Sequence, residues 1–363
     1  MTLSSVARAL SIAAMIVTIV GACWVGEPAQ AAEREFYRLE SALTLKSPNR
    51  PDWDYLAFDA KRSYLFISRR EDGILVYDVN AKKEVKTLEQ SEGGNATALI
   101  PELDRGYVIK EDGTGLAFKL STLAPIERLK FGASADNGFY DPVTQQLLIT
   151  MGDEKRATFV DAKTGKVSGT LAVDSGKLEG SAPDGRGNFF MALRDRNKVI
   201  RIDARRRKVT DEWTPQGCEL PTGLAYDSAT QRVFISCRGN KPILAVLDPA
   251  SGKVVANPTI GRGSDDVVFD SQAHRIYSSN GFDGTLVVIE QLDANTYKLS
   301  EAITTRPFAR TMALDPKTKK VYLVTAEGAV DPSQPWNRNV TDFYPNVFFK
   351  DTFTLLTYSR QRP

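Results

Sequence analysis

Short runs of hydrophobic residues, separated by turn residues, recur along almost the whole chain. The first set reads YLAFD, SYLFISRR, GILVYDV and EVKTLEQ. Runs of this length, rich in Val, Ile, Leu, Tyr and Phe and bounded by turn residues, are typical of β-strands. Beyond residue 31 no stretch repeats its hydrophobic positions with the period of a helix, so we expect almost no helix.

These sets of four strands repeat at a nearly constant interval. In each set an acidic residue, here called the anchor, follows the first hydrophobic run, and successive anchors are 43, 39, 43, 43, 43 and 45 residues apart. The anchors are Asp59, Glu102, Asp141, Asp184, Asp227, Asp270 and Asp315. A period near 43 with four strands per repeat is typical of a propeller blade. The sequence therefore predicts an all-β, seven-bladed β-propeller of four-stranded antiparallel blades.

The two ends of the chain are predicted to close the ring. After the last anchor the sequence supplies two further strands of the last blade, at 320–325 and 352–359. Residues 35–45 offer the missing outer strand, and its pairing with 352–359 removes an open sheet edge. Residues 32–363 then form a single propeller domain.

A long segment, 328–350, interrupts the last blade between its second and third strands. Long irregular loops in compact domains are usually binding loops, lids or unstructured segments. This one is too aromatic for an unstructured linker, and three prolines stiffen it. We expect a lid that includes Trp336, Phe343 and Tyr344, or a contact for a partner; packing on the rim is the alternative.

The first 31 residues are predicted to form a secretory signal peptide. A hydrophobic run over 9–25 follows Arg8 and precedes the sequence AQA, which gives a cleavage site after Ala31. The alternatives are an uncleaved anchor and lipid attachment at Cys23, because the sequence VGAC resembles a lipobox. In each case we expect the mature chain to work in the periplasm or as a secreted protein, and we expect no transmembrane segment in it.

Removal of the signal peptide leaves Cys218 and Cys237 as the two cysteines. In an oxidising compartment this pair favours one disulfide. The strand order supports the pairing, because Cys218 precedes the innermost strand of the fifth blade and Cys237 ends the neighbouring antiparallel strand. Two buried free thiols are the alternative, and two thiolates without a nearby histidine make a poor metal site.

Composition and charge narrow the chemistry. The chain has 363 residues, with 47 Lys and Arg against 45 Asp and Glu, so a globally basic nucleic-acid coat is excluded. The single histidine, His274, lies in a turn between a first and a second strand. A three-histidine zinc centre is therefore impossible, and a Ser-His-Asp triad would rest on this residue alone. The chain has neither a haem-attachment C-x-x-C-H motif nor a nucleotide-binding glycine loop.

Polar residues are predicted to ring one end of the central channel, where each innermost strand begins. Five residues before the anchors stand Asp54, Thr97, Asp136, Glu179, Thr222, Asp265 and Arg310. Asn137 and Asp266 directly follow two of these positions. Buried charge is costly unless it is paired, so this ring does not read as core. We expect a ligand-binding rim formed by Asp54, Asp136, Asn137, Glu179, Thr222, Asp265, Asp266 and Arg310.

This rim admits two interpretations. The first is a funnel that binds a cation, a metal ion or a polar ligand. Hard oxygen ligands would suit a divalent cation such as Ca²⁺ or Mg²⁺, and the candidate metal ligands are Asp54, Asp136, Glu179 and Asp265. The second is a water-filled channel lined by solvated acids, with Arg310 neutralising part of their charge.

Loops between second and third strands would surround the funnel with basic residues. They carry Arg69, Arg70, Lys110, Lys155, Arg156, Arg194, Arg196, Arg238 and Lys241. Such a rim would attract nucleic acid or an acidic partner. Acidic residues are interleaved in the same loops and aromatic residues are few, so an ordinary solvated surface is favoured over a nucleic-acid track.

The blade pattern resembles a known family. Turns of the form V-x-D-x-x-T-G-K-V, with WDYL at 53–56, CELPTGLA at 218–225 and ARTMALDP at 309–316, are similar to the YVTN-type seven-bladed propellers of the bacterial YncE-like family. The resemblance covers nearly all of the mature chain and implies the propeller fold and export. Most members have no assigned reaction, although single-stranded DNA binding occurs among them. Blade two departs from the pattern at Pro101 and 118–120, and the last blade at its insertion.

Together these features predict an exported, monomeric propeller that binds a small polar ligand or a periplasmic protein through its funnel. No catalytic residue is assigned. One alternative is a metal-dependent, lactonase-like hydrolase, in which a carboxylate-bound divalent cation activates water. Another is a propeller subunit of a periplasmic oxidoreductase, like the large subunits of amine dehydrogenases in the wider propeller class.

Overall fold

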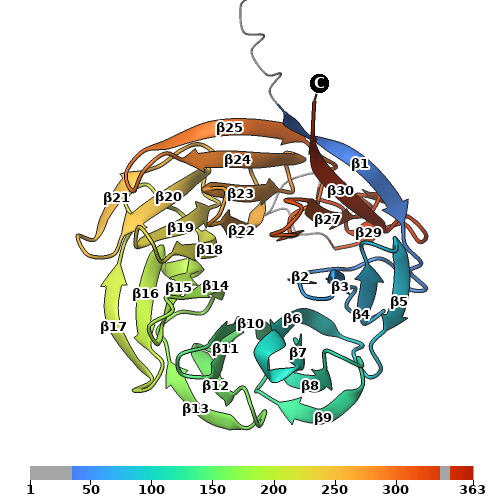
Figure 1. Ribbon diagram of the computed structural model, residues 1–363, viewed down its shortest axis with the longest axis horizontal. Helices are drawn as coiled ribbons and strands as arrows, with labels where there is room; N and C mark the ends of the chain where they lie inside the picture. The colour runs from blue at the N-terminus through green and yellow to red at the C-terminus, as the bar shows by residue number, and fades with distance from the viewer. Residues whose placement is uncertain (1–34, 336–343, 363) are drawn as a thin grey trace, which may run out of the picture.

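The computed structural model describes residues 35–335 and 344–362. Within them the chain forms seven four-stranded antiparallel sheets arranged in a ring (Figure 1), which confirms the predicted seven-bladed β-propeller. The helical segments of this described part are two 3₁₀ turns, η1 (Pro101–Leu103) and η2 (Arg194–Arg196). The expectation of almost no helix therefore holds for these residues.

Blades 1 to 6 each use four consecutive strands, ordered from the channel outwards. The strands of blades 1 to 3 are β2 (Leu56–Asp59), β3 (Tyr64–Ser68), β4 (Ile74–Asp78), β5 (Lys83–Thr87), β6 (Gly94–Ile100), β7 (Arg105–Lys110), β8 (Thr114–Lys119), β9 (Pro125–Lys130), β10 (Ala135–Asp141), β11 (Gln146–Met151), β12 (Arg156–Asp161) and β13 (Val167–Ala172). Those of blades 4 to 6 are β14 (Leu178–Pro183), β15 (Asn188–Leu193), β16 (Lys198–Asp203), β17 (Lys208–Trp213), β18 (Pro221–Asp227), β19 (Arg232–Cys237), β20 (Ile243–Asp248), β21 (Lys253–Ala256), β22 (Ser264–Asp270), β23 (Arg275–Asn280), β24 (Thr285–Gln291) and β25 (Tyr297–Thr304).

Blade 7 joins the two ends of the chain. Its strands, from the channel outwards, are β26 (Met312–Leu314), β27 (Val321–Thr325), β30 (Thr354–Gln361) and β1 (Phe36–Thr44). Strand β1 pairs with β30 along its whole length, from Phe36 opposite Gln361 to Thr44 opposite Thr354 (Figure 1). The predicted closure by the N-terminal strand is therefore present.

The core consists of separate clusters at the junctions between blades. Alternate residues of a strand point to opposite faces of its sheet. In β3, Leu65 and Ile67 pack toward blade 7, whereas Phe66 packs toward blade 2. Each of the seven junctions holds such a cluster of buried hydrophobic residues. Because both faces of the inner strands are buried, these strands read as continuous hydrophobic runs.

The anchor carboxylates stabilise the turns between first and second strands. Asp141 accepts hydrogen bonds from the N–H and the hydroxyl of Thr144, at 2.9 and 2.6 Å. Asp227 accepts the N–H of Ala229 at 2.9 Å and the hydroxyl of Thr230. Both carboxylates are buried. Such side-chain-to-backbone bonds fix a tight turn and explain why an acid recurs at this position.

Blade 2 breaks this pattern, and the assignment of Glu102 as its anchor is wrong. Strand β6 continues to Ile100, which lies opposite Arg105, as the anchors of other blades lie opposite the start of the second strand. Pro101 begins η1, so Glu102 lies two residues beyond the anchor position. Every position counted back from Glu102 is shifted by the same two residues.

The insertion of blade 7 begins as a short hairpin. Strand β28 (Gly328–Ala329) pairs with β29 (Val347–Phe348). The hairpin lies between β27 and β30, the second and third strands of the blade, as the sequence predicts. Residues 336–343 of the insertion lie outside the described residues.

Candidate ligand-binding site

Charged side chains from five innermost strands meet at one end of the central channel. Asp54, Asp136, Glu179, Asp265 and Arg310 lie at or near the starts of β2, β10, β14, β22 and β26. All five line a single cavity of about 430 Å³, here called the funnel cavity. The predicted convergence of these five side chains therefore occurs in the structure.

A second set of side chains reaches the funnel cavity from loops that follow the second strands. We count six residues on from the residue opposite the anchor and call this the loop position. In blades 1 to 7 the loop position holds Arg70, Glu111, Gly152, Arg194, Arg238, Gly281 and Ala326. The first five of these residues line the cavity. Blades 1 to 4 thus offer the site both a rim residue and a loop residue, blade 5 a loop residue, and blades 6 and 7 a rim residue.

Asp54 is held by two arginines. An oxygen of its carboxylate accepts a hydrogen bond from Arg70 at 2.7 Å, and Arg310 lies 3.7 Å from the same oxygen. Arg70 also binds Glu111 of the next blade at 2.7 Å. This chain of ion pairs ties blades 7, 1 and 2 together around the cavity.

Asp265 is likewise shared between two arginines. Nε of Arg310 forms an ion pair with one of its oxygens at 2.8 Å, and Arg238 of the preceding blade binds the other oxygen. Arg310 also donates to the carbonyl of Trp53 at 2.9 Å, and its guanidinium lies 5.7 Å from that ring. Arg238 lies 5.4 Å from the ring of Phe282. Aromatic faces and carboxylates therefore fix both guanidinium groups.

Glu179 and Asp136 differ in their partners. Glu179 pairs with Arg194, the loop residue of its own blade, at 3.1 Å. In blade 3 the loop position is Gly152, which carries no side chain. Among the described residues no Lys or Arg forms an ion pair with Asp136, and its side-chain partner is the amide of Asn95 at 2.8 Å.

Asn95 is the rim residue of blade 2, which the sequence analysis placed at Thr97. The two-residue shift after β6 explains this correction, because Asn95 is five residues before Ile100. Its Nδ2 donates to the side chain and to the backbone carbonyl of Asp136, at 2.8 and 2.9 Å. Both partners are acceptors, so the orientation of the amide is fixed.

Burial raises the pKa of most carboxyl groups at the rim. The pKa of Asp136 is raised well above its usual value by burial and by the nearby charges of Asp54 and Glu179. Burial also raises the pKa of Asp54 and of Glu179, although their arginine partners oppose the shift. Burial raises the pKa of Asp266 to about 6. The site therefore disfavours the ionised form of these acids relative to an exposed carboxyl group.

Tyr55 is a lining residue that the rim prediction missed. It follows Asp54, and burial together with Asp136, Asp54 and Glu179 raises the pKa of its phenol well above the usual value. Its backbone N–H donates to the carbonyl of Asn95. A neutral phenol among carboxylates supplies both a hydrogen-bond donor and an apolar ring face.

Three predicted rim residues do not line the funnel cavity. Thr222 is buried, and its hydroxyl donates to the carbonyl of Leu220 at 3.0 Å. Asn137 bonds locally, accepting the N–H of Gly138 at 2.7 Å. Asp266 lies 3.5 Å from the backbone nitrogen of Met312. These three side chains therefore serve packing or local hydrogen bonding.

The innermost strands of blades 4, 5 and 6 approach one another closely. A Cβ on Gly180 would lie 2.6 Å from the carbonyl oxygen of Thr222, and one on Gly223 would lie 2.8 Å from the nitrogen of Val267. Neither distance is tolerated by a real side chain. Glycine at these two positions therefore lets the strands of neighbouring blades touch backbone to backbone.

The carboxylates do not form a metal site. No group of three or more His, Cys, Asp or Glu side chains within the described residues is arranged to hold a metal ion. Asp54, Glu179 and Asp265 are each paired with arginine, and Asp136 alone cannot supply the six to eight oxygens that Ca²⁺ takes. The residues present therefore do not fit the divalent cation considered from the sequence.

Tyr344 reaches the funnel cavity from the insertion. Its ring packs edge-on against Phe282 and Phe308, with centroids 5.7 and 5.4 Å away. The other two predicted lid residues, Trp336 and Phe343, lie outside the described residues. The described part of the insertion thus supplies one aromatic wall of the cavity.

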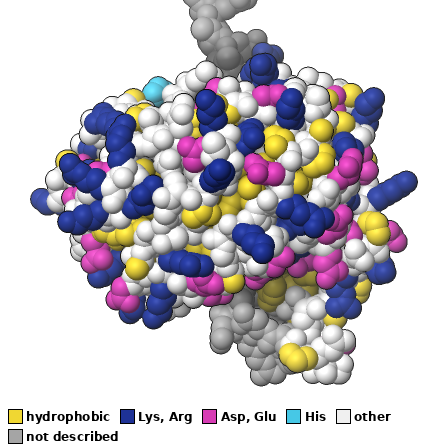
Figure 2. All heavy atoms as spheres, turned by 90° about the horizontal axis from the view of Figure 1, so that it is seen from below, with side chains coloured by type: hydrophobic (Ala, Val, Ile, Leu, Met, Phe, Trp, Pro, Cys, Tyr) yellow, Lys and Arg dark blue, Asp and Glu magenta, His cyan; other side chains and the backbone are white. Residues whose placement is uncertain are grey.

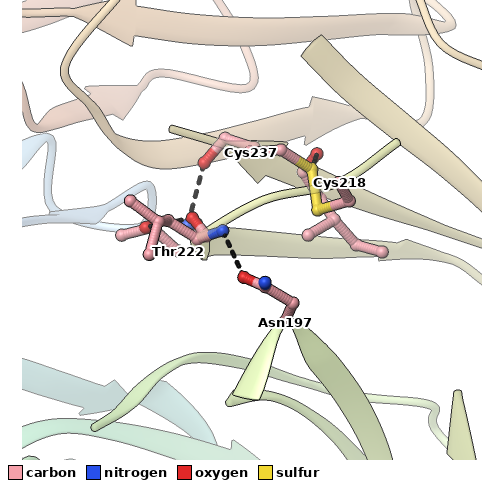
Figure 3. Close-up of a disulfide and its surroundings, with 8 residues drawn as sticks. Asn197, Cys218, Thr222 and Cys237 are labelled. Carbon is pink, nitrogen blue, oxygen red and sulfur yellow. Dashed lines mark hydrogen bonds between the residues drawn. A yellow bond between two sulfur atoms is a disulfide. The ribbon is translucent and has the colours of Figure 1, made fainter. Parts of the chain in front are cut away.

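The predicted disulfide joins Cys218 to Cys237, with Cα atoms 5.1 Å apart (Figure 3). It lies beside the rim of blade 5. Within the same loop, the backbone N–H of Leu220 donates to Asn197 of blade 4 at 2.8 Å. The crosslink and this bond hold the start of β18 beside its neighbour, directly before the loop that carries Arg238.

The side of the ring seen in Figure 2 has no single dominant charge. Figure 2 shows Lys and Arg side chains interleaved with Asp and Glu over one edge of the ring. Many of the loop arginines are engaged by acids, as Arg196 is by Asp174 at 2.9 Å. Within residues 35–335 and 344–362, no helix is long and apolar enough to cross a membrane.

Fold and site together define a seven-bladed propeller with a charged funnel cavity at one end of its channel. No protein-family model matches the sequence. Two curated proteins, both called uncharacterized protein YncE, from Escherichia coli K12 and O157:H7, are 29% identical over 201 residues, or 54% of this chain and 45% of theirs. The chain thus spans about half the length of the curated relatives that it matches. These matches and the fold fit the YncE-like propeller family.

Two solved structures illustrate how widely the fold occurs. A chain from the crystal structure of the mitotic checkpoint complex aligns with a TM-score of 0.69 and 13% identity, over 98% of this chain and 99% of that one. A chain of Kuenenia stuttgartiensis hydrazine synthase aligns with a TM-score of 0.64 and 14% identity, over 77% of this chain and 94% of that one. At such identities the likeness concerns the fold alone.

Proposed function

We propose that the protein is an exported, non-catalytic scaffold that binds a small polar ligand in the funnel cavity. The observation that carries this proposal is that every blade sends a charged side chain into one cavity of about 430 Å³. These side chains are Asp54, Glu111, Asp136, Glu179, Arg238, Asp265 and Arg310. Concave sites of this size with convergent polar groups are typical of small-molecule binding.

The pairing of the rim acids favours binding over hydrolysis. A general acid or base must be free to exchange a proton with its substrate. Asp54, Glu179 and Asp265 are fixed by arginines, Asp136 accepts a hydrogen bond from the amide of Asn95, and the single histidine lies in a turn between β22 and β23. The metal-dependent hydrolase would need a cation that these residues do not fit. The fold likeness to hydrazine synthase, an enzyme by its title, gives no residue of the funnel cavity a catalytic role.

Export is part of the same proposal. The N-terminal 31 residues have the pattern of a secretory signal peptide. The disulfide between Cys218 and Cys237 suits an oxidising compartment. N-terminal sequencing of the protein purified from a periplasmic extract would test it; a chain that begins at Ala32 supports export, and a chain that retains Met1 in the cytosol contradicts it.

A variant that fills the cavity tests ligand binding. Gly152 lines the cavity, and a Cβ there would lie 3.7 Å from the carbonyl oxygen of Ser134 and 3.8 Å from Nζ of Lys177, so a side chain enters without strain. Gly152→Trp should block the cavity, whereas Gly152→Ala should leave it open. The screen would expose the protein to amines, amino acids, sugars, carboxylates and nucleotides and follow thermal unfolding.

We expect at least one of these classes to stabilise the wild type and Gly152→Ala but not Gly152→Trp. A ligand at about 100 times its Kd raises the free energy of unfolding by about 2.7 kcal/mol, which is readily measured. The proposal fails if no class stabilises the wild type, or if Gly152→Trp responds as the wild type does.

A further inference from the structure

Three of the four carboxylates in the funnel cavity that come from innermost strands carry an internal counter-ion, and one does not. Asp54, Glu179 and Asp265 each bind at least one arginine. Asp136 is the exception among the described residues. The cause lies in the sequence, because blade 3 has Gly152 where blades 1, 4 and 5 have arginine. Because Gly152 has no side chain, the carboxylate of Asp136 has open space beside it, and its negative charge is not balanced by an arginine.

A second acceptor without a donor lies next to Asp136. Asn95 is 1% exposed and lines the funnel cavity, and its Nδ2 is committed to Asp136. Its Oδ1 has no hydrogen-bond partner among the groups described. Buried carbonyl oxygens are rarely left without a donor, so this atom independently points to a ligand. The two acceptors, one charged and one neutral, come from adjacent blades, and both residues line the same cavity.

We propose that Asp136 and Asn95 form a recognition site for a primary ammonium group of the ligand. The inference rests on the proposed function and specifies its ligand class. An ammonium offers three N–H donors and one positive charge. It would take the place that an arginine at the loop position holds in the neighbouring blade, where Arg194 meets Glu179. Charge-assisted bonds to a carboxylate are the stronger kind, and the amide oxygen adds direction.

Other ligand chemistries match these acceptors less well. An anion would be repelled by the carboxylate of Asp136, and the side-chain oxygen of Asn95 cannot donate to it. A quaternary ammonium would supply charge but no N–H donor. A divalent cation would find one carboxylate without a basic partner, since Arg or Lys side chains pair with the other five. Six carboxylates and five basic groups line the cavity, so one added positive charge balances it.

The charged groups around Asp136 predict a proton exchange on binding. Asp54 and Glu179 disfavour its ionised form, whereas Lys177 and Arg70 favour it. Lys177 is itself held by Asp153 at 3.0 Å. An ammonium beside Asp136 favours the carboxylate and lowers its raised pKa, so a proton leaves the protein as the ligand enters. Binding heat should then depend on the ionisation enthalpy of the buffer.

Calorimetric titration with putrescine, a linear diamine, tests the proposal. Butanediol of the same length lacks the charge, and tetramethylammonium lacks the donors. Asp136→Asn removes the charge with little change of shape, and Gly152→Arg supplies the arginine that blade 3 lacks. Gly152→Ala and Asp174→Asn are the controls, because Asp174 is not among the residues that line the cavity and its side chain is 89% exposed.

We expect putrescine to bind the wild type and both controls with similar affinity and with proton release. Asp136→Asn and Gly152→Arg should each weaken binding by at least about tenfold, and the two reference compounds should not bind. Each of these two variants is expected to lose affinity by itself. If one of them misfolds, the other still tests the proposal. Equal affinity in the wild type and both variants overturns the proposal, as does equal binding of tetramethylammonium.

The outcome is distinguishable from failure of the proposed function. A ligand from the broader screen that requires an open Gly152 but ignores Asp136→Asn would leave the funnel cavity as a binding site and overturn the ammonium assignment. Putrescine binding that persists in Gly152→Trp would place the amine elsewhere and overturn the assignment too.

Discussion

Acids form two rings in the propeller, and blades 1, 3, 4 and 6 have an acid at each end of the innermost strand. At the turn end, anchors such as Asp141, Asp227 and Asp270 are buried and bond the N–H groups of their own turns. At the cavity end, Asp54 and Glu179 are also buried but are bonded to arginines from separate loops. The same residue type thus has a structural role at one end and forms a site at the other.

The difference lies in where the hydrogen-bond donors come from. Backbone donors within three residues of an anchor form with the turn itself and need no further segment of chain. Side-chain donors at the cavity end come from other loops and other blades, as Arg238 reaches Asp265 from blade 5 to blade 6. Among the anchors, Asp227 has a lowered pKa, because hydrogen bonds from Thr230 and Gln291 outweigh the effect of its burial. At the cavity end, Asp54, Asp136 and Glu179 have raised pKa values.

The largest expected effect is loss of an anchor. Asp227→Ala removes four hydrogen bonds, to Ala229, Thr230 and Gln291. Unfolding free energy should fall by about 2–4 kcal/mol near neutral pH, because buried donors lose their acceptor. The folded-state pKa of Asp227 is lowered, so its ionised form stabilises the fold above the usual pKa of a carboxyl, and this stabilisation fades as the pH falls further. Urea unfolding at neutral and acid pH measures both.

A matched substitution separates the carboxylate from the turn. Asp227→Asn keeps one acceptor oxygen, so its free energy of unfolding should fall by roughly half as much as that of Asp227→Ala. If Asp227→Ala were as stable as the wild type, the anchor would not stabilise its turn, and the contrast between the two rings would disappear.

The fold was predictable because the anchors act locally. A carboxylate that caps its own turn leaves a mark at a fixed place in every repeat, and spacings close to 43 residues revealed seven blades. Hydrophobic runs then supplied the strands, and the leftover run at 35–45 supplied the closing one. The prediction failed in blade 2, because Pro101 begins a 3₁₀ turn and Glu102 lies beyond the anchor position. The count from Glu102 therefore missed Asn95 as the rim residue.

The site was predictable only in part, because its contacts cross between blades. Counting from the anchors brought Asp54, Asp136, Glu179, Asp265 and Arg310 together correctly. The same count could not show which acid meets which arginine, since that depends on the distance between loops. A second count, from the start of each second strand, would have exposed the glycine of blade 3 among the arginines of blades 1, 4 and 5.

A smaller effect, of opposite sign to the anchor's, is expected at Asp266. Its folded-state pKa of about 6 exceeds the usual 3.8, so the ionised form is disfavoured in the folded protein. The penalty is absent below about pH 4 and complete above the folded pKa. Asp266→Asn should therefore stabilise the protein by about 2–3 kcal/mol at alkaline pH and by almost nothing at pH 4. Chemical unfolding across this pH range, with Glu111→Gln as an exposed control, measures the difference in unfolding free energy between Asp266→Asn and the wild type. If burial were not the cause, this difference would not change with pH.

The smallest effect is expected at Glu179, although its ion pair with Arg194 is 3.1 Å long. Burial raises the pKa of Glu179 in spite of this arginine, so desolvation outweighs the attraction. Glu179→Gln should change unfolding free energy by less than about 1 kcal/mol, because loss of the pair is offset by relief of a buried charge. Its difference from the wild type should shift toward stabilisation as the pH rises, opposite to the trend for Asp227→Ala. A loss as large as the anchor's, growing with pH, would mean that the arginines stabilise the cavity acids as effectively as backbone donors stabilise the turns.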